Sequence, residues 1–151
     1  METTLAVLGW LQNTLSTCVD LQTATGLTEY ELKDNIYHLM AEKDSSFPYL
    51  VHVIRDAEWP IGTKDYSLDI WTFSEDGSPT AEAQALAIKA VLKKNKLLIG
   101  NRINTDGDEV IDGRIWWVYG NFVETDNENV AHYETVWSVR YFAKQEVPEA
   151  T

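Results

Sequence analysis

The sequence predicts an α+β protein with a small, mostly antiparallel or mixed sheet of about four strands and two to three helices. Residues 66–73 alternate between two faces with the period of a strand, and residues 78–95 carry apolar side chains at helical spacing. Further strand-like segments lie before and after this pair. We therefore place the other elements around a strand–turn–helix unit that spans Tyr66–Asn95.

The turn between this strand and its helix is the polar run at residues 74–77. Ser78 offers an N-cap oxygen, and Pro79 suits the first helical position. One stripe of small apolar side chains is predicted to face the sheet, and it consists of Ala83, Leu86, Ala87, Ala90 and Val91.

The N-terminal region is predicted to be helical. A first helix over residues 4–20 places Leu5, Leu8, Gln12 and Leu15 on one face, and Gly26 breaks the pattern. Residues 28–43 have two interpretations. Thr28 and Glu31 form a capping box before helically spaced apolar residues, which favours a helix, whereas residues 35–38 fit a short extended segment.

Three strands surround the central unit in the prediction. Residues 49–54 form an apolar β-branched run, expected to pair antiparallel with residues 66–73 across a long loop at residues 55–65. Residues 114–123 form a strand with Ile115, Trp117 and Tyr119 on one face and Trp116 and Val118 on the other. The last strand covers residues 132–142.

Length and composition predict one domain over residues 1–151. It divides into a helical region at 1–46, a sheet-and-helix core at 47–143 and a frayed tail at 144–151. The formal charge of −12 argues against general nucleic-acid binding, which needs clustered Lys and Arg. Cys18 is the only cysteine, expected as a buried, inert thiol, and no disulfide can form within the chain. Without a bilayer-length apolar run or a signal-peptide pattern, a protein made in a cytoplasm and not bound to membrane is expected.

Catalytic, metal and cofactor motifs are not apparent. The acidic segment at residues 101–113 fails both registers of the twelve-residue calcium loop, so a solvated turn is favoured. His38, His52 and His132 share no ligand or catalytic spacing and are expected as surface or satisfied core residues. We therefore predict no enzyme activity, no metal and no cofactor.

Aromatic residues exceed what one face of a small sheet buries, and both faces of the predicted sheet are partly apolar. Either a neighbouring subunit covers the second face, or the first helix covers one face and residues 79–95 the other. The predicted interface residues are Trp59, Pro60, Trp71 and Trp116, of which the first two lie in the long loop. An unrelated oligomeric adaptor and a carbohydrate-binding module with a Trp-rich sheet are the alternatives.

Three motifs carry a resemblance to a known family. They are Phe47-Pro48-Tyr49 at the start of the first strand, Asp69-Ile70-Trp71 before the helix, and Val139-Arg140-Tyr141 in the last strand. Over residues 47–143 the chain resembles the tail-completion (tail-terminator) proteins of long-tailed bacteriophages. The acidic insert at residues 101–113 and the longer segment before Phe47 depart from the family pattern.

The resemblance implies a tail-terminator-like fold and a non-enzymatic structural protein of the virion tail or neck, assembled in the host cytoplasm. Such proteins form a homo-oligomeric ring, usually a hexamer, on the head-proximal end of the tail tube. The ring stops polymerisation of the tail tube protein and joins the tail to a head-completion or connector protein, while DNA passes through without specific binding. At least one of two acidic loops is predicted to line the channel, and the alternative is a solvated outer loop that is acidic for solubility. The candidates are Asp106, Asp108, Glu109 and Asp112 in one loop and Glu124, Asp126 and Glu128 in the other.

Overall fold

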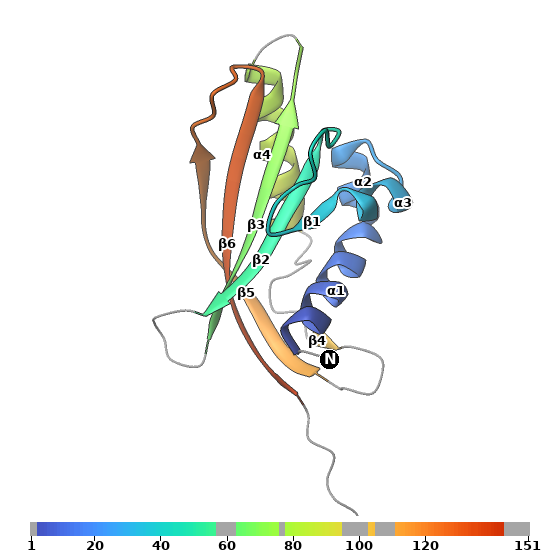
Figure 1. The fold of residues 1–151 in the computed structure, drawn as a ribbon, viewed down its shortest axis with the longest axis vertical. Coiled ribbons are helices and arrows are strands. Elements are labelled where there is room, and N and C mark those ends of the chain that lie inside the picture. Colours follow the sequence, from blue (N-terminus) through green and yellow to red (C-terminus); the bar gives the residue numbers. More distant parts are fainter. Residues whose placement is uncertain (1–2, 57–62, 76–77, 95–102, 105–110, 144–151) are drawn as a thin grey trace, which may run out of the picture.

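The computed structural model describes residues 3–56, 63–75, 78–94, 103–104 and 111–143, and Figure 1 shows their arrangement. The helices are α1 (Thr3–Ser16), α2 (Val19–Thr25), α3 (Glu29–Asp34) and α4 (Ser78–Lys94). The strands are β1 (Ile36–His38), β2 (Tyr49–Asp56), β3 (Lys64–Phe73), β4 (Ile103–Asn104), β5 (Ile111–Val123) and β6 (Val130–Ala143).

The six described strands form one mixed sheet in the order β1-β2-β3-β6-β5-β4. The β1–β2 pair is parallel and the other pairs are antiparallel. The predicted α+β class is confirmed, and so is the antiparallel pairing of β2 with β3. The sheet exceeds the predicted four strands because two short edge strands, β1 and β4, extend it on either side.

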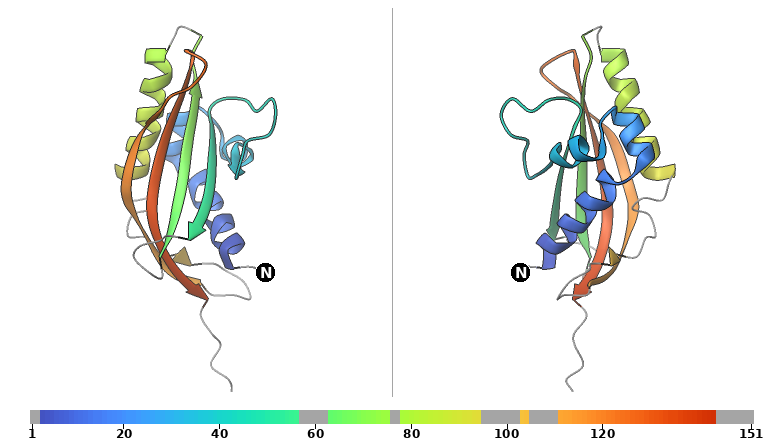
Figure 2. Two further views of the ribbon diagram at one scale, coloured as in Figure 1. Left: turned by 60° about the vertical axis from the view of Figure 1, so that its left-hand side comes forward. Right: turned by 90° about the vertical axis from the view of Figure 1, so that its right-hand side faces the viewer.

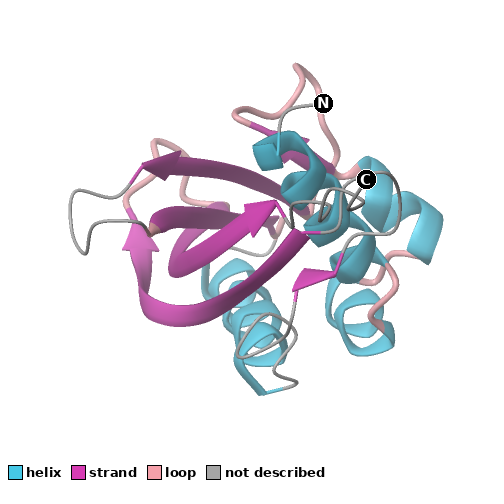
Figure 3. Ribbon diagram, turned by 90° about the horizontal axis from the view of Figure 1, so that it is seen from below, coloured by secondary structure: helices cyan, strands magenta, loops and turns pink. Residues whose placement is uncertain are grey.

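All four described helices lie on the same face of the sheet (Figures 2 and 3). One hydrophobic cluster joins Leu11 of α1, Leu21 of α2, Leu32 of α3 and Ile88 of α4 to Leu68 of β3. The interpretation in which the first helix covers one face and α4 the other is therefore wrong. The alternation in β3 explains why the helices lie on one face. Every second side chain of this strand is buried, and the buried side chains face the helices.

Helix α4 packs through a different stripe from the one predicted. Its fully buried side chains are Ala81, Ala85, Ile88 and Leu92, whereas Ala83, Leu86, Ala87 and Ala90 are exposed. Val91 is partly buried against the core. The helix has two apolar stripes on opposite sides, and the one that contains the larger residues Ile88 and Leu92 fills the core.

The N-terminal helix is shorter than predicted, because the chain breaks between α1 and α2 at residues 17–18. The Thr17 and Ser16 hydroxyls donate to the Asn13 carbonyl at 2.9 and 3.1 Å, and such local bonds compete with helix continuation. Val7, Leu8, Leu11 and Leu15 form its buried stripe, while Leu5 is exposed. Cys18 lies at the break and is half-buried rather than buried. Gly26 ends α2 in the left-handed conformation, as its position predicts.

Residues 28–43 combine the two interpretations. The capping box of Thr28 and Glu31 is present, but the helix ends at Asp34 and residues 36–38 form strand β1. Asn35 causes the change of direction, because its amide donates to the carbonyls of Ser46 and Pro48 at 3.2 and 3.0 Å. The continuous helix predicted for this segment is therefore wrong, and the extended alternative is confirmed for residues 36–38.

Strand β5 begins earlier than predicted and contains an irregularity between Trp117 and Tyr119. Trp117 pairs with Trp137, and Tyr119 pairs with the very next residue of β6, Val136. A bulge of this kind moves all later side chains to the opposite face. Tyr119 consequently shares a face with Trp116, and not with Ile115 and Trp117 as predicted.

Candidate functional site: the open face of the sheet

The face of the sheet turned away from the helices carries the candidate site. Figure 2 shows this face in its left panel, where no described helix lies in front of the strands. In β3 the buried residues Tyr66, Leu68, Ile70 and Thr72 face the helices, which leaves Asp65, Ser67, Asp69, Trp71 and Phe73 on the other side. We call that side the open face.

Aromatic rings form a continuous row across one end of the open face. The aromatic row consists of Phe47, Tyr49, Trp71, Phe73 and His132. Strand register creates it, because Tyr49 of β2 pairs with Trp71 of β3, which pairs in turn with His132 of β6. Side chains directly opposite on one face of adjacent strands are in contact distance.

The indole of Trp71 is enclosed between two rings. The His132 imidazole stacks on it with centroids 3.9 Å apart at an interplanar angle of 13°, and Tyr49 stacks with centroids 5.9 Å apart at 18°. Phe47 extends the row by stacking on Phe73 at 5.6 Å. These mutual contacts order the rings as a preformed apolar surface, which lowers the entropic cost of binding a partner.

Acidic side chains lie beside the aromatic row. Asp69 accepts a hydrogen bond from His132 Nε2 through Oδ2 at 2.9 Å, while its buried Oδ1 has no hydrogen-bond partner among the described residues. Tyr119 donates to Glu134 at 3.2 Å, and partial desolvation and the Glu134 charge raise the pKa of Tyr119. Asp69 and Glu134 are paired residues of β3 and β6, whereas Asp65 lies farther along β3 and pairs with Arg55 of β2.

The predicted interface residues fall into two groups. Trp71 lies in the aromatic row, and Trp116 is 39% exposed on the open face, because it pairs with Ser138 of β6. Trp59 and Pro60 lie outside the described residues. The structure thus brings two predicted residues to one surface, together with Tyr49, Phe73 and His132, which were not predicted as interface residues.

The predicted acidic loops are described only in part. Asp106, Asp108 and Glu109 lie outside the described residues, and Asp112 is placed only by its backbone pairing with Asn104 and Phe142. Glu124, Asp126 and Glu128 lie in the turn between β5 and β6 and line a pocket of about 360 Å³.

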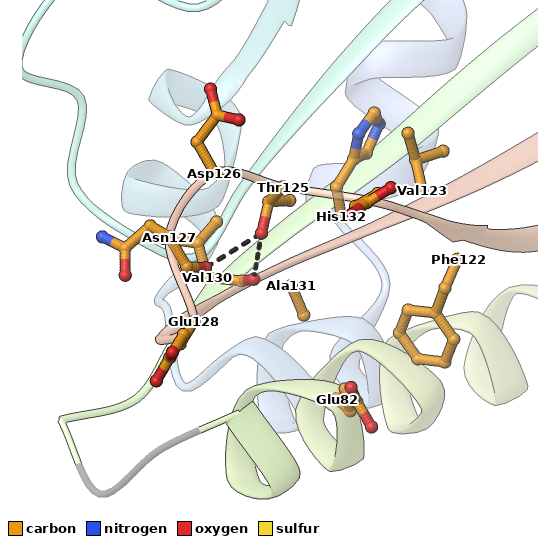
Figure 4. Close-up of a pocket in the computed structure, with 11 residues that line it drawn as sticks. Glu82, Phe122, Val123, Thr125, Asp126, Asn127, Glu128, Val130, Ala131 and His132 are labelled. Atoms are coloured by element: carbon orange, nitrogen blue, oxygen red, sulfur yellow. Dashed lines mark hydrogen bonds between the residues drawn. The ribbon is translucent and has the colours of Figure 1, made fainter.

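The pocket at this turn does not gather its acids at one point. Figure 4 shows the carboxylates of Asp126 and Glu128 pointing away from each other, while the Thr125 hydroxyl lies 2.9 Å from the carbonyls of Asn127 and Val130. Among the described residues no three His, Cys, Asp or Glu side chains are placed to hold a metal ion. The turn is thus ordered by its own hydrogen bonds.

The three histidines occupy different environments. His52 is a buried core residue with a hydrogen-bond partner, which is one of the two environments predicted for the histidines. Its Nδ1 lies 2.8 Å from the buried Tyr66 hydroxyl. His38 is exposed on β1, with its ring centroid 6.3 Å from that of His52. The His38–His52 contact and the His132–Asp69 bond arise from strand pairing, so sequence spacing could not reveal them.

Comparison with known proteins yields a similarity of fold. No protein-family model matches the chain, and no curated protein sequence matches it. None of the described helices has the length and apolarity needed to cross a membrane. The fold is similar to that of a chain in a solved structure described as "Virion of native gene transfer agent (GTA) particle", with a TM-score of 0.60 and 14% sequence identity. The match covers 92% of this chain and 93% of that chain, so it includes nearly the whole of both.

Proposed function

We propose that this chain is a structural protein of a phage-like virion that forms a ring on the head-proximal end of the tail tube. The ring ends tube polymerisation and joins the tail to the head connector. The observation that carries the proposal is the near full-length similarity of fold to a virion chain. The tail-terminator resemblance in residues 47–143 supports the finer assignment, and the open face supports assembly with other subunits.

A role as a carbohydrate-binding module fits the aromatic row less well. Sugar rings stack on the free face of an indole or phenol, as cations and aromatic rings do. The His132 ring stacks closely on Trp71, with centroids 3.9 Å apart, and Tyr49 makes a second, offset contact at 5.9 Å. The Trp71 indole is therefore less available for sugar stacking than a free ring would be.

Deletion of the gene from its virus, followed by electron microscopy of the lysate, tests the proposed function. We expect filled heads separated from tails, and tails of irregular length because nothing stops the tube protein from polymerising. Expression of the wild-type protein in trans should restore joined particles. Joined particles with tails of normal length in the deletion strain would refute the assignment. Particles that lack this protein at the neck and still carry joined tails of normal length would also refute it.

We further propose that one of the two acidic loops lines the channel through which DNA passes. Exposed charges are screened beyond roughly 8 Å at physiological salt, so only acids at the wall repel passing phosphates. Replacement of Asp106, Asp108 and Glu109 by Lys, or in a second variant of Glu124, Asp126 and Glu128, should leave rings intact but slow DNA ejection. A variant with normal ejection and normal rings places its loop away from the channel, and two such variants contradict the proposal.

A further inference from the structure

Strand β5 forms an edge of the sheet for most of its length. Strand β6 pairs with it on one side throughout, whereas β4 pairs with it on the other side only at Asp112 and Gly113. Among the described residues no strand adjoins this outer side over residues 115–123, a length of about 30 Å. We call residues 115–123 the β5 edge. Because an edge strand directs alternate N–H and C=O groups away from its sheet, the β5 edge can pair with an extended strand.

The β5 edge lacks the features by which soluble proteins usually protect such edges. It contains no charged residue and no proline, and the irregularity between Trp117 and Tyr119 is its one interruption. Five of its large hydrophobic side chains are between 36% and 49% exposed, and they are Trp116, Val118, Tyr119, Phe122 and Val123. An uncharged, hydrophobic edge of this length is a template for pairing with another chain.

The opposite edge of the sheet is protected. Strand β1 is three residues long, and Leu39, which follows it, has a φ of 73°, so the strand does not continue in extended form. Where β2 extends past β1, it ends in the exposed charged residues Arg55 and Asp56. Short strands and charged side chains discourage edge pairing. The contrast identifies β5 as the edge at which a strand is added to this sheet.

The charges at the two ends of the β5 edge favour a second copy of this chain as the partner. The nearest charged residues along the chain are Arg114 before the segment and Glu124 after it, and Asp112 lies two residues farther out. Antiparallel pairing of two β5 edges brings the Arg114 end of each copy beside the Glu124 end of the other. Parallel pairing would instead bring like charges together, which is destabilising in a sheet.

Charged side chains also lie beside the β5 edge on both faces of the sheet. On the helix side, the ammonium of Lys93 lies 4.6 Å from the centre of the Trp117 ring. On the open face, Glu134 of β6 accepts a hydrogen bond from Tyr119 at 3.2 Å. Two copies of Glu134 would be three strand spacings apart, about 14 Å, which exceeds the screening length of roughly 8 Å. Exposed charges on flexible side chains interact weakly in water, so backbone pairing and apolar burial decide the contact.

We propose that two copies of the free protein associate by antiparallel pairing of their β5 edges, which joins their sheets into one. The contact is isologous, because both copies contribute the same segment around a two-fold axis. Main-chain hydrogen bonds hold the two strands together, and exposed side chains on both faces lose contact with water. A ring of identically oriented copies uses heterologous contacts instead. The inference therefore concerns the free protein and does not rest on the proposed ring.

Sedimentation equilibrium of the wild type and of two valine variants tests whether β5 forms the contact. The wild type should show a monomer–dimer equilibrium. Val118→Lys should weaken dimerisation at least about tenfold, because a lysine on an edge strand opposes strand pairing. Val19→Lys is the matched control, since it makes the same substitution at an exposed valine of α2, and it should dimerise like the wild type. Thermal melting of both variants at low concentration should show monomers that are folded.

Disulfide cross-linking tests the direction of the two strands. Single cysteines are introduced into Cys18→Ser protein by Tyr119→Cys, Asn121→Cys and Val123→Cys, at exposed alternate positions of β5. The variants are oxidised alone and in pairwise mixtures. Antiparallel pairing cross-links only those combinations whose two residue numbers have one constant sum. A two-fold axis at Asn121, for example, cross-links that variant with itself and Tyr119→Cys with Val123→Cys. Lys33→Cys, at an exposed position of α3, should cross-link with none of them.

Four results would overturn the inference. They are a wild type that stays monomeric at its highest soluble concentration, a Val118→Lys variant that dimerises like the wild type, cross-linking of every β5 position with itself, and equal cross-linking through Lys33→Cys. The proposed function is scored separately, by head–tail joining in the deletion strain. If Val118→Lys dimerises like the wild type and the deletion strain still fails to join heads to tails, the β5 contact is rejected and the proposed function stands.

Discussion

Acid should destabilise this protein through His52. The side chain is buried on the helix side of β2, with Nδ1 at 2.8 Å from the Tyr66 hydroxyl. Burial is the main cause, and the nearby His38 the second, of a pKa lowered from 6.5 to about 4. Burial also raises the pKa of Tyr66 well above its usual value, so its neutral phenol remains available as a donor to the neutral imidazole.

The sign and size of the effect follow from proton linkage. Between pH 6.5 and about 4 the unfolded chain holds a proton at His52 that the folded protein does not hold, so stability falls as pH falls through this range. The difference between the two pKa values corresponds to about 3 kcal/mol of folding stability. This stability is fully present above pH 6.5 and is lost below about pH 4. At pH 5 the loss relative to pH 8 is about 2 kcal/mol.

Urea unfolding of the wild type and of His52→Gln at pH 8 and pH 5 measures this loss. Glutamine retains an acceptor for Tyr66 but does not titrate, and the other ionisable groups are common to both proteins. The stability advantage of the wild type over the variant should therefore shrink by about 2 kcal/mol between pH 8 and pH 5. An NMR titration of the wild-type histidines provides an independent measurement. A His52 resonance that titrates near pH 6.5, or an advantage that does not change with pH, would refute the reasoning.

Three further substitutions test packing and a fourth tests assembly. Gly120→Ala should destabilise the fold by about 1–3 kcal/mol in thermal unfolding, because the new Cβ would lie 2.6 Å from Trp117 Cη2 and 2.8 Å from Tyr133 Cε1. Gly9→Ala, where nothing lies within 4 Å, should stabilise α1 by up to about 1 kcal/mol, and equal effects at the two glycines would contradict this. Thr72→Val should cost about 1 kcal/mol in urea unfolding, because the Thr72 hydroxyl donates to the Ala81 carbonyl at 2.6 Å in the core, and an unchanged midpoint would count against that bond. Trp59→Ala should weaken self-association into rings by about 2 kcal/mol or more in sedimentation equilibrium, while the monomer melts as the wild type; a large fall in melting temperature would instead place Trp59 in the core.

The strands were predictable because each carries its own signal. The period of two in β2, β3 and β6 depends only on residues adjacent in sequence, and antiparallel pairing of β2 with β3 follows from their order. The short strand β1 was harder to predict. Its three residues carry no period of their own, and it is a strand because Asn35 ties the chain to the segment that enters β2.

The candidate site could be predicted only in part. Trp71 and Trp116 stand out in sequence as surplus aromatic residues of a sheet, and both lie on the open face. The stacking of Trp71 on His132 and the bond from His132 to Asp69 depend on the register between β3 and β6, strands that are far apart in the sequence. Similarly, the displacement of Tyr119 to the open face follows from a single irregularity in β5, which no periodic pattern indicates.

The error in orienting α4 shows what a helical pattern leaves open. Hydrophobic periodicity identifies an apolar face of a helix but not which of two such faces meets the sheet. Here both faces satisfy the pattern, and the core selects Ile88 and Leu92 over Leu86 because they bury more side-chain area.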